Sequence, residues 1–225
     1  MSEKIAVDLG NVQKTLFLPL WGRAHETGKP DPLLVDKTAL EIIERVDFDF
    51  STIAGNMSEL SQIGWIMRSL RVDGVIAGFL EKHPQATVVN IGCGLDTTFN
   101  RVDNGQLLWY DLDLPDVIAL RKKFIREDDR SKIIATSFSE KGWLKDIAVR
   151  DGILFIAAGV FYYFEAEEIK GFLKALADEF PDGEIVFDVC SPLGVKTANR
   201  MVVKSAGMDE RSEEHTSELQ SPNTI

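Results

Sequence analysis

The chain has 225 residues, of which 44% are apolar and 27% charged, a length and composition typical of one folded domain with a sizeable core. Its net charge of −11 argues against a phosphate-binding surface, so we expect neither nucleic acid nor an anionic membrane as a partner. Only two cysteines occur, with no Cys/His cluster around them, so we expect no disulfide framework and no metal site. No stretch resembles a signal peptide or a membrane span, which predicts a soluble, cytoplasmic protein.

Residues 1–85 carry helical patterns and are expected to form a helical lid. Asp36 precedes apolar residues at helical spacing and is suited to cap the first of these helices. A second helix is predicted from residue 62 to residue 82, because Pro84 disfavours the helical conformation at the residue before it.

From residue 86 onwards, near-continuous apolar runs alternate with helical patterns. Pro115 suits the first turn of one helix, and the acidic residues that begin at Glu165 suit the first turn of another. This alternation predicts an α/β fold with a doubly wound, mostly parallel sheet, which we assign to residues 86–210. The five predicted strands are residues 86–92, 106–113, 132–138, 152–159 and 183–190.

The final residues have a different character. The segment RSEEHTSELQS, residues 211–221, corresponds to one translated frame of a common sequencing adapter. We therefore expect the native sequence to end near Glu210 and residues 211–225 to be a non-native tail. The alternative is a polar, disordered C-terminus, which is common in proteins.

A glycine loop follows the first predicted strand, in VVNIGCGLDTTF at residues 88–99. Gly92 and Gly94 lack a Cβ atom and allow a tight turn that approaches a ligand closely. The next strand ends in Asp111 and Asp113, about twenty residues later, where a carboxylate can accept hydrogen bonds from ribose hydroxyls. This pattern fits either a nicotinamide dinucleotide or S-adenosylmethionine.

Two residues of the loop favour S-adenosylmethionine. Thr97 replaces the third glycine of the dinucleotide pattern, and the carboxylate of Asp96 would repel a pyrophosphate. The sulfonium and ammonium groups of S-adenosylmethionine tolerate a nearby carboxylate. With Thr98, these residues are also suited to cap the following helix and to point toward the ligand crevice.

Several segments together resemble the leucine carboxyl methyltransferase family: VVNIGCGLDTTF, WYDLDLPDVIALRKK, GWL at residues 142–144 and LFIAAGVFYYF. The family includes protein phosphatase carboxyl methyltransferases and the O-methyltransferases of tetracenomycin-type polyketide synthesis. The segment TLFLPLWGRAHETGKPDPLLVDKTA resembles the bacterial branch. The resemblance implies a Rossmann-like class I methyltransferase with S-adenosylmethionine as methyl donor. It also implies two further strands after the fifth, so we expect the chain to be truncated there.

The resemblance assigns roles to single residues. Gly92 and Gly94 match the cofactor loop, and Arg71 matches an arginine that faces the methionine carboxylate. Asp113 matches the acid that holds the ribose, with Asp111 as the second candidate.

Two later segments complete the implied pocket. Ser137 and Phe138 fall where the family lines the adenine, and Ala158, Gly159 and Tyr163 fall where it closes the methyl-donor pocket. The aromatic cluster that contains Tyr163 is expected either to form a pocket wall, and so contact substrate, or to pack in the core.

This sequence also departs from the family. Asn90 stands where many class I enzymes have an acid, and Ala158 where a glutamate is often found. Arg23 is a candidate for contact with an acidic substrate, while a salt bridge to Glu26 or Asp31 is the alternative. No convincing catalytic base occurs.

Three functions therefore compete. The leading one is an O-methyltransferase that acts on a carboxylate or hydroxyl oxygen of a small molecule, with a protein C-terminus as the second acceptor class. The others are an NAD(P)-dependent oxidoreductase and a non-catalytic relative that binds the cofactor.

Overall fold

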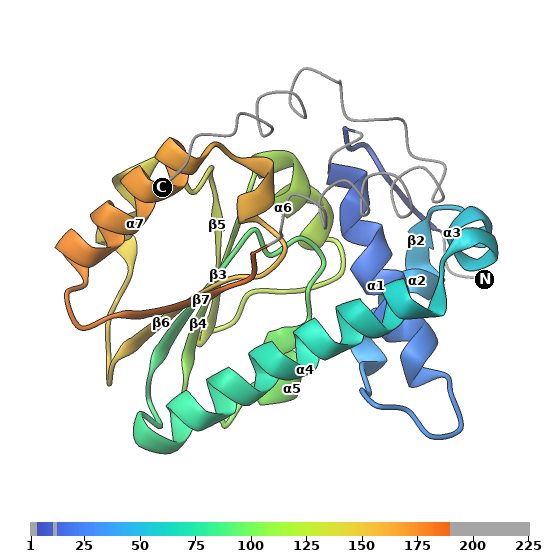
Figure 1. Ribbon diagram of the computed structural model, residues 1–225, viewed down its shortest axis with the longest axis horizontal. Coiled ribbons are helices and arrows are strands. Elements are labelled where there is room, and N and C mark those ends of the chain that lie inside the picture. Colours follow the sequence, from blue (N-terminus) through green and yellow to red (C-terminus); the bar gives the residue numbers. More distant parts are fainter. Residues whose placement is uncertain (1–3, 11–12, 190–225) are drawn as a thin grey trace.

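The computed structural model describes residues 4–10 and 13–189, and its centre is a five-stranded sheet in the order β5-β4-β3-β6-β7 (Figure 1). All pairings within it are parallel, which confirms the predicted α/β architecture. The strands lie within one or two residues of the predicted segments at their starts and end up to three residues earlier. They are β3 (Thr87–Ile91), β4 (Leu108–Asp113), β5 (Ser131–Ala135), β6 (Ile153–Ala157) and β7 (Glu184–Phe187).

The strand order reverses at β3, since β4 and β5 extend from one side of it and β6 and β7 from the other. In open parallel sheets a ligand binds beyond the carboxyl ends of the strands at such a switch point. The register brings Asn90 of β3 beside Asp111 of β4 and Ile156 of β6. The residues after β3, β4 and β6 therefore meet at one edge of the sheet.

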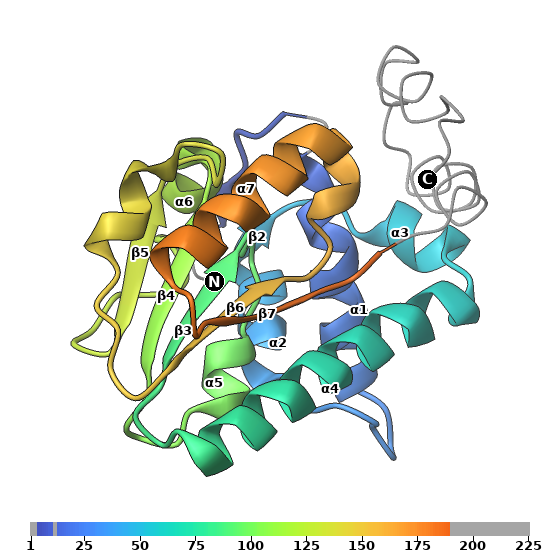
Figure 2. The same ribbon diagram turned by 60° about the vertical axis from the view of Figure 1, so that its left-hand side comes forward.

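Helices cover both faces of this sheet, and Figure 2 shows α4 and α7 on opposite sides of it. On one side, apolar residues of α4 and α5 pack against Val88, Trp109 and Leu154. On the other side, α7 packs against Val89 and Phe155. The helices that follow the strands are α5 (Thr98–Val102), α6 (Pro115–Arg121), η2 (Lys141–Asp146), η3 (Phe161–Tyr163) and α7 (Ala166–Glu179).

The N-terminal part is mainly helical, as predicted. The carboxylate of Asp36 accepts a hydrogen bond from the Ala39 amide at 2.9 Å, which confirms its capping role. The long helix begins before the predicted residue 62, because the Ser58 hydroxyl caps it. These helices are η1 (Gln13–Leu16), α1 (Phe17–Thr27), α2 (Lys37–Arg45), α3 (Ser51–Asn56) and α4 (Glu59–Lys82).

One element of this region was not predicted. Two short strands, β1 (Ile5–Ala6) and β2 (Val46–Asp47), form a separate parallel pair. The predicted non-native tail, residues 211–225, and the end of the fifth predicted strand at residue 190 lie outside the described residues. Within the described ranges, no helix combines the length and the apolar character that crossing a membrane requires.

Candidate functional site

A pocket of about 700 Å³ opens at the carboxyl ends of the central strands. Its walls come from the loops after β3, β4, β5 and β6, from the end of β7, and from η1, α1 and α4. The pocket brings together all but one of the residues that the sequence marked as candidates. The lining candidates are Arg23, Arg71, Gly92, Gly94, Asp113, Ser137, Phe138, Ala158, Gly159 and Tyr163.

The glycine loop forms the floor of this pocket. Gly92 and Gly94 have φ angles of 63° and 48°, in the left-handed region that favours glycine. A Cβ atom on Gly92 would lie 2.5 Å from Cγ2 of Val160, so no larger residue fits without a shift. The Gly94 amide donates to Oδ2 of Asp113 at 2.7 Å, which joins the loop to the end of β4.

Asp111, the second ribose candidate, does not line the pocket, which corrects that prediction. Its side chain points to the same face of β4 as that of Asp113, because the two residues are two positions apart on the strand. Asp111 lies further from the carboxyl end of the strand and is 1% exposed. Its carboxylate accepts hydrogen bonds from Asn90, Trp109 and Arg121. These donors leave Asp111 enclosed by the protein, while Asp113 faces the pocket.

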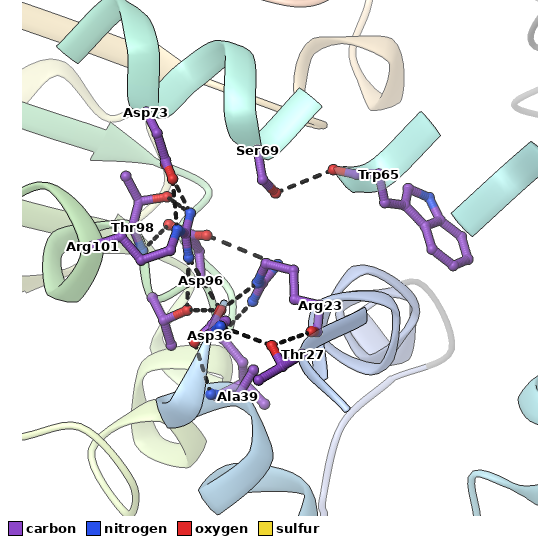
Figure 3. Close-up of polar contacts among 12 residues, drawn as sticks. Arg23, Thr27, Asp36, Ala39, Trp65, Ser69, Asp73, Asp96, Thr98 and Arg101 are labelled. Atoms are coloured by element: carbon purple, nitrogen blue, oxygen red, sulfur yellow. Dashed lines mark hydrogen bonds and ion pairs between the residues drawn. The ribbon is translucent and has the colours of Figure 1, made fainter. Parts of the chain in front are cut away.

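Arg23 lies at the pocket wall, but its guanidinium group bonds to the protein itself (Figure 3). It is 3% exposed, its Nε donates to Asp36 at 2.8 Å, and its Nη2 donates to the Leu95 carbonyl at 3.0 Å. The expected alternative, an internal salt bridge, is therefore the one formed, with Asp36 in place of Glu26 or Asp31. A direct substrate contact by Arg23 would require these bonds to break.

The residues between the glycines and α5 also differ in part from expectation. The carboxylate of Asp96 caps the Thr98 amide at 3.0 Å and lines the pocket. Thr97 instead turns its hydroxyl to Asp36, so it does not point into the crevice. Burial alone would raise the pKa of Asp96, but the charges of Arg23 and Arg101 and the Thr98 hydrogen bonds lower it to about 2. Asp96 therefore stays ionised at the pocket, where it is 3.9 Å from the Arg23 guanidinium group.

Two arginines on α4 face the same pocket, one helical turn apart. Arg71, the predicted one, is exposed, and its side chain makes no ion pair or hydrogen bond with another described residue. Arg68, which the sequence reasoning missed, donates to the Tyr162 hydroxyl at 3.3 Å and to Asp188 at 3.2 Å. Asp188 also accepts the Gly159 amide at 2.7 Å, so it links the ends of β6 and β7 to α4.

The aromatic cluster after β6 serves both roles that the sequence left open. Phe161 is buried in the core, whereas Tyr162 and Tyr163 line the pocket. Burial raises the pKa of Tyr162 to about 12, in spite of the charge of Arg68. Phe138 packs against this cluster at its buried side.

Neither described histidine belongs to the site. His25 stacks on Trp21 with ring centroids 4.9 Å apart, and His83 lies 3.5 Å from Asp151 at the end of α4. Within the part of the chain that the structure describes, no group of three or more His, Cys, Asp or Glu side chains is arranged to hold a metal ion.

Comparison with known proteins decides the family. Residues 17–177 match the sequence model of the family described as leucine carboxyl methyltransferase. The chain belongs to the leucine carboxyl methyltransferase family.

Named relatives agree with this assignment. The chain is 31% identical over 193 residues to the tetracenomycin polyketide synthesis O-methyltransferase TcmP of Streptomyces glaucescens, covering 85% of this chain and 71% of that protein. It is 28% identical over 204 residues to the S-adenosyl-L-methionine-dependent methyltransferase dpfgK of Gibberella zeae, covering 83% and 68%.

The solved structures that match this chain include two methyltransferases. The plantazolicin methyltransferase BamL, in a complex with SAH, is 13% identical with a TM-score of 0.46, over 93% of this chain and 67% of that one. The mitomycin 7-O-methyltransferase MmcR is 19% identical with a TM-score of 0.43, over 89% and 52%.

Membership of this family makes the chain an S-adenosylmethionine-dependent methyltransferase, and the oxidoreductase alternative finds no support among these relatives. The residues present fit this cofactor. The floor at Gly92 accepts no side chain without a shift, Asp113 offers a carboxylate bonded to the Gly94 amide, and Arg71 offers a cation that lines the same pocket. The pocket volume is within the range of about 300–1,000 Å³ that is usual for small-molecule sites.

Proposed function

We propose that this chain transfers the methyl group of S-adenosylmethionine to a carboxylate oxygen of a small molecule, and that it acts in the cytoplasm. The observation that carries the proposal is the pocket at the switch point of the sheet, where Gly92, Asp113 and Arg71 surround one space. TcmP and dpfgK, both methyltransferases by name, support it.

In this proposal each wall binds one part of the cofactor. Arg71 pairs with the methionine carboxylate, and Gly92 and Gly94 let the backbone approach the methionine end. The carboxylate of Asp113 accepts hydrogen bonds from the ribose. On the remaining walls, Ser137 and Phe138 contact the adenine, Ala158 and Gly159 lie behind the methyl group, and Tyr163 faces the acceptor.

The reaction requires little acid–base catalysis by the protein. When bound, S-adenosylmethionine supplies an activated methyl group on a cationic sulfur, and the acceptor oxygen displaces the sulfur. The protein's part is to align the acceptor oxygen with the methyl group and to exclude water.

Two pocket groups bear on which oxygen accepts the methyl group. With a pKa of about 2, Asp96 binds protons weakly, and with a pKa of about 12, Tyr162 keeps its proton at neutral pH. Neither is suited to act as a general base there, and the other two carboxylates that line the pocket, Asp113 and Asp188, already accept hydrogen bonds from backbone amides. A carboxylate acceptor is already an anion and needs no base, which favours it over a hydroxyl group.

Isothermal titration calorimetry with SAH and with NADH tests the cofactor assignment. We expect SAH to bind and NADH not to bind; binding of NADH alone would contradict the proposal. Asp113→Ala should weaken SAH binding, whereas Asp116→Ala, an exposed acid on α6 outside the pocket, should leave it unchanged.

The acceptor is tested with S-adenosylmethionine labelled in the methyl group and a panel of aromatic carboxylic acids and phenols. A methyl ester releases labelled methanol in alkali, whereas a methyl ether keeps the label. We expect label that alkali releases. Label that survives alkali would show that a hydroxyl oxygen is the acceptor.

A further inference from the structure

Three consecutive carbonyl groups of the glycine loop, at residues 94–96, accept hydrogen bonds from two buried arginines. Arg121 of α6 donates to the carbonyl oxygens of Gly94 at 3.0 Å and Asp96 at 2.6 Å. Arg23 of α1 donates to the one between them, Leu95, at 3.0 Å. The two arginines are 2% and 3% exposed, so both hold the loop from inside the protein.

The two supports come from different parts of the chain. Arg121 follows β4 and belongs to the sheet region, like the loop itself. Arg23 comes from the N-terminal helices, 72 residues before the carbonyl group that it holds. The position of α1 therefore affects the conformation of the loop that forms the pocket floor, because Arg23 joins the two.

Asp36 fixes Arg23 in this place (Figure 3). One oxygen of its carboxylate caps α2, and the other accepts bonds from Arg23 at 2.8 Å, from Arg101 at 3.1 Å and from the Thr97 hydroxyl. The Asp36 carboxylate is therefore shared between the N-terminal helices and the first turn of α5.

Arg101 extends the same cluster to the long helix. It binds both carboxylate oxygens of Asp73 on α4, at 2.7 and 2.9 Å, and donates to the Thr98 hydroxyl at 2.8 Å. The cluster thus joins α1, α2, α4 and α5 directly beneath the loop. Buried ion pairs add little net stability compared with apolar packing of the same volume. What they supply is geometry, because a planar guanidinium group fixes several acceptors in one arrangement.

We propose that Arg23 is a positioning residue of the methyltransferase, which fastens the N-terminal helices to the cofactor loop so that the loop takes its binding shape only when these helices are docked. The proposal rests on the proposed function, in which residues 92–94 carry the cofactor. Arg23 acts through the Leu95 carbonyl and Asp36 and touches no reacting atom.

Two variants test the fastening. Arg23→Lys keeps the charge beside Asp36 but offers one nitrogen in place of a planar fork, so it cannot reproduce the contact in which Nε binds Asp36 and Nη2 binds the Leu95 carbonyl. Thr97→Val has nearly the same shape and removes only the hydroxyl, which donates to Asp36 and accepts from Arg101. It remains informative if the lysine variant does not fold. Arg130→Lys is the control, because Arg130 also donates through two nitrogens, both to Asp103, and lies outside the pocket.

Hydrogen exchange of the full chain without ligand measures the fastening alone. We expect amides of residues 92–98 to exchange about tenfold faster or more in Arg23→Lys and Thr97→Val, since each loses a buried hydrogen bond to a charged group. The control should match the wild type. Unchanged loop exchange in both variants would overturn the proposal.

Calorimetry with SAH, well below each melting temperature, measures the consequence. We expect the dissociation constant to rise about tenfold or more in both variants and to stay unchanged in the control. In the wild type, SAH should also slow exchange in α1 and α2, and this protection should be lost in Arg23→Lys. Faster loop exchange with unchanged SAH affinity would refute the positioning role. Absence of SAH binding to the wild type, with loop exchange altered as expected, would overturn the proposed function and leave the fastening intact.

Discussion

Replacing Gly92 by alanine gives the sharpest test of the pocket floor. The residue has a φ of 63°, and a left-handed conformation costs an alanine roughly 1–2 kcal/mol. The added Cβ atom would also lie 2.5 Å from Cγ2 of Val160, and overpacking of this kind typically costs about 1–3 kcal/mol. Together, Gly92→Ala should lower the free energy of unfolding by about 2–5 kcal/mol.

Gly105→Ala separates the two contributions. Gly105 has a φ of 79°, and a Cβ atom there would meet nothing within 4 Å. This variant should lose only the conformational part, about 1–2 kcal/mol, in urea unfolding followed by circular dichroism. It should also bind SAH like the wild type, whereas Gly92→Ala should bind it more weakly, because Val160 lines the pocket and must move.

A rescue variant checks the named contact. Val160→Ala removes both γ-methyl groups, so in the double variant it should return part of the stability that Gly92→Ala loses. Equal destabilisation by Gly92→Ala and Gly105→Ala, or a double variant that shows no recovery, would refute the assignment of the loss to close packing against Val160.

The remaining predictions concern charged groups. Arg71→Gln should raise the SAH dissociation constant about tenfold or more, with little change in melting temperature, because Arg71 has no ion pair among the described residues; an unchanged affinity would argue against its role. The pKa of Asp96 is lowered from 3.8 to about 2 on folding, so the folded state binds fewer protons at this carboxyl than the unfolded state. The ionised carboxylate therefore stabilises the folded state above about pH 4, and this stabilisation is lost as the pH falls toward 2. The difference in unfolding free energy between the wild type and Asp96→Asn should therefore be about 2 kcal/mol larger at neutral pH than at pH 2, and a pH-independent difference would contradict this. Asp188→Asn should lower the unfolding free energy by less than about 1 kcal/mol, because its ion pair with Arg68 is partly exposed; urea unfolding measures this, and a much larger loss would show a tighter coupling of β7 to α4.

The sheet and the glycine loop could be predicted because their signals are local. Strands β3 and β6 are buried on both faces, so their sequences are continuous apolar runs between turns. The cap at Asp36 also depends on residues three apart. The pair formed by β1 and β2 could not be predicted in this way, because two-residue strands are too short to show alternation.

The polar contacts of the site were harder to predict, because their partners are distant in sequence. For Arg23, proximity along the chain suggested Glu26 or Asp31, yet its carboxylate partners are Asp36 and Asp96, and Glu26 pairs with Lys29. Asp111 and Asp113 share a strand and a face, and they differ in their partners: Asp111 accepts hydrogen bonds from Asn90, Trp109 and Arg121, whereas Asp113 accepts one from the Gly94 amide at the pocket. Arg68 gave no sequence signal, since it meets Asp188 across 120 residues.

Thr97 bears on both the choice of ligand and the packing of the N-terminal helices. In the sequence it counted against a dinucleotide because it replaces a glycine of the GxGxxG pattern. The structure adds a positive reason for a side chain here, since the Thr97 hydroxyl donates to Asp36, the carboxylate that also caps α2 and binds Arg23. A glycine would leave that buried carboxylate short of one donor, so the departure from the dinucleotide pattern follows from how the N-terminal helices dock.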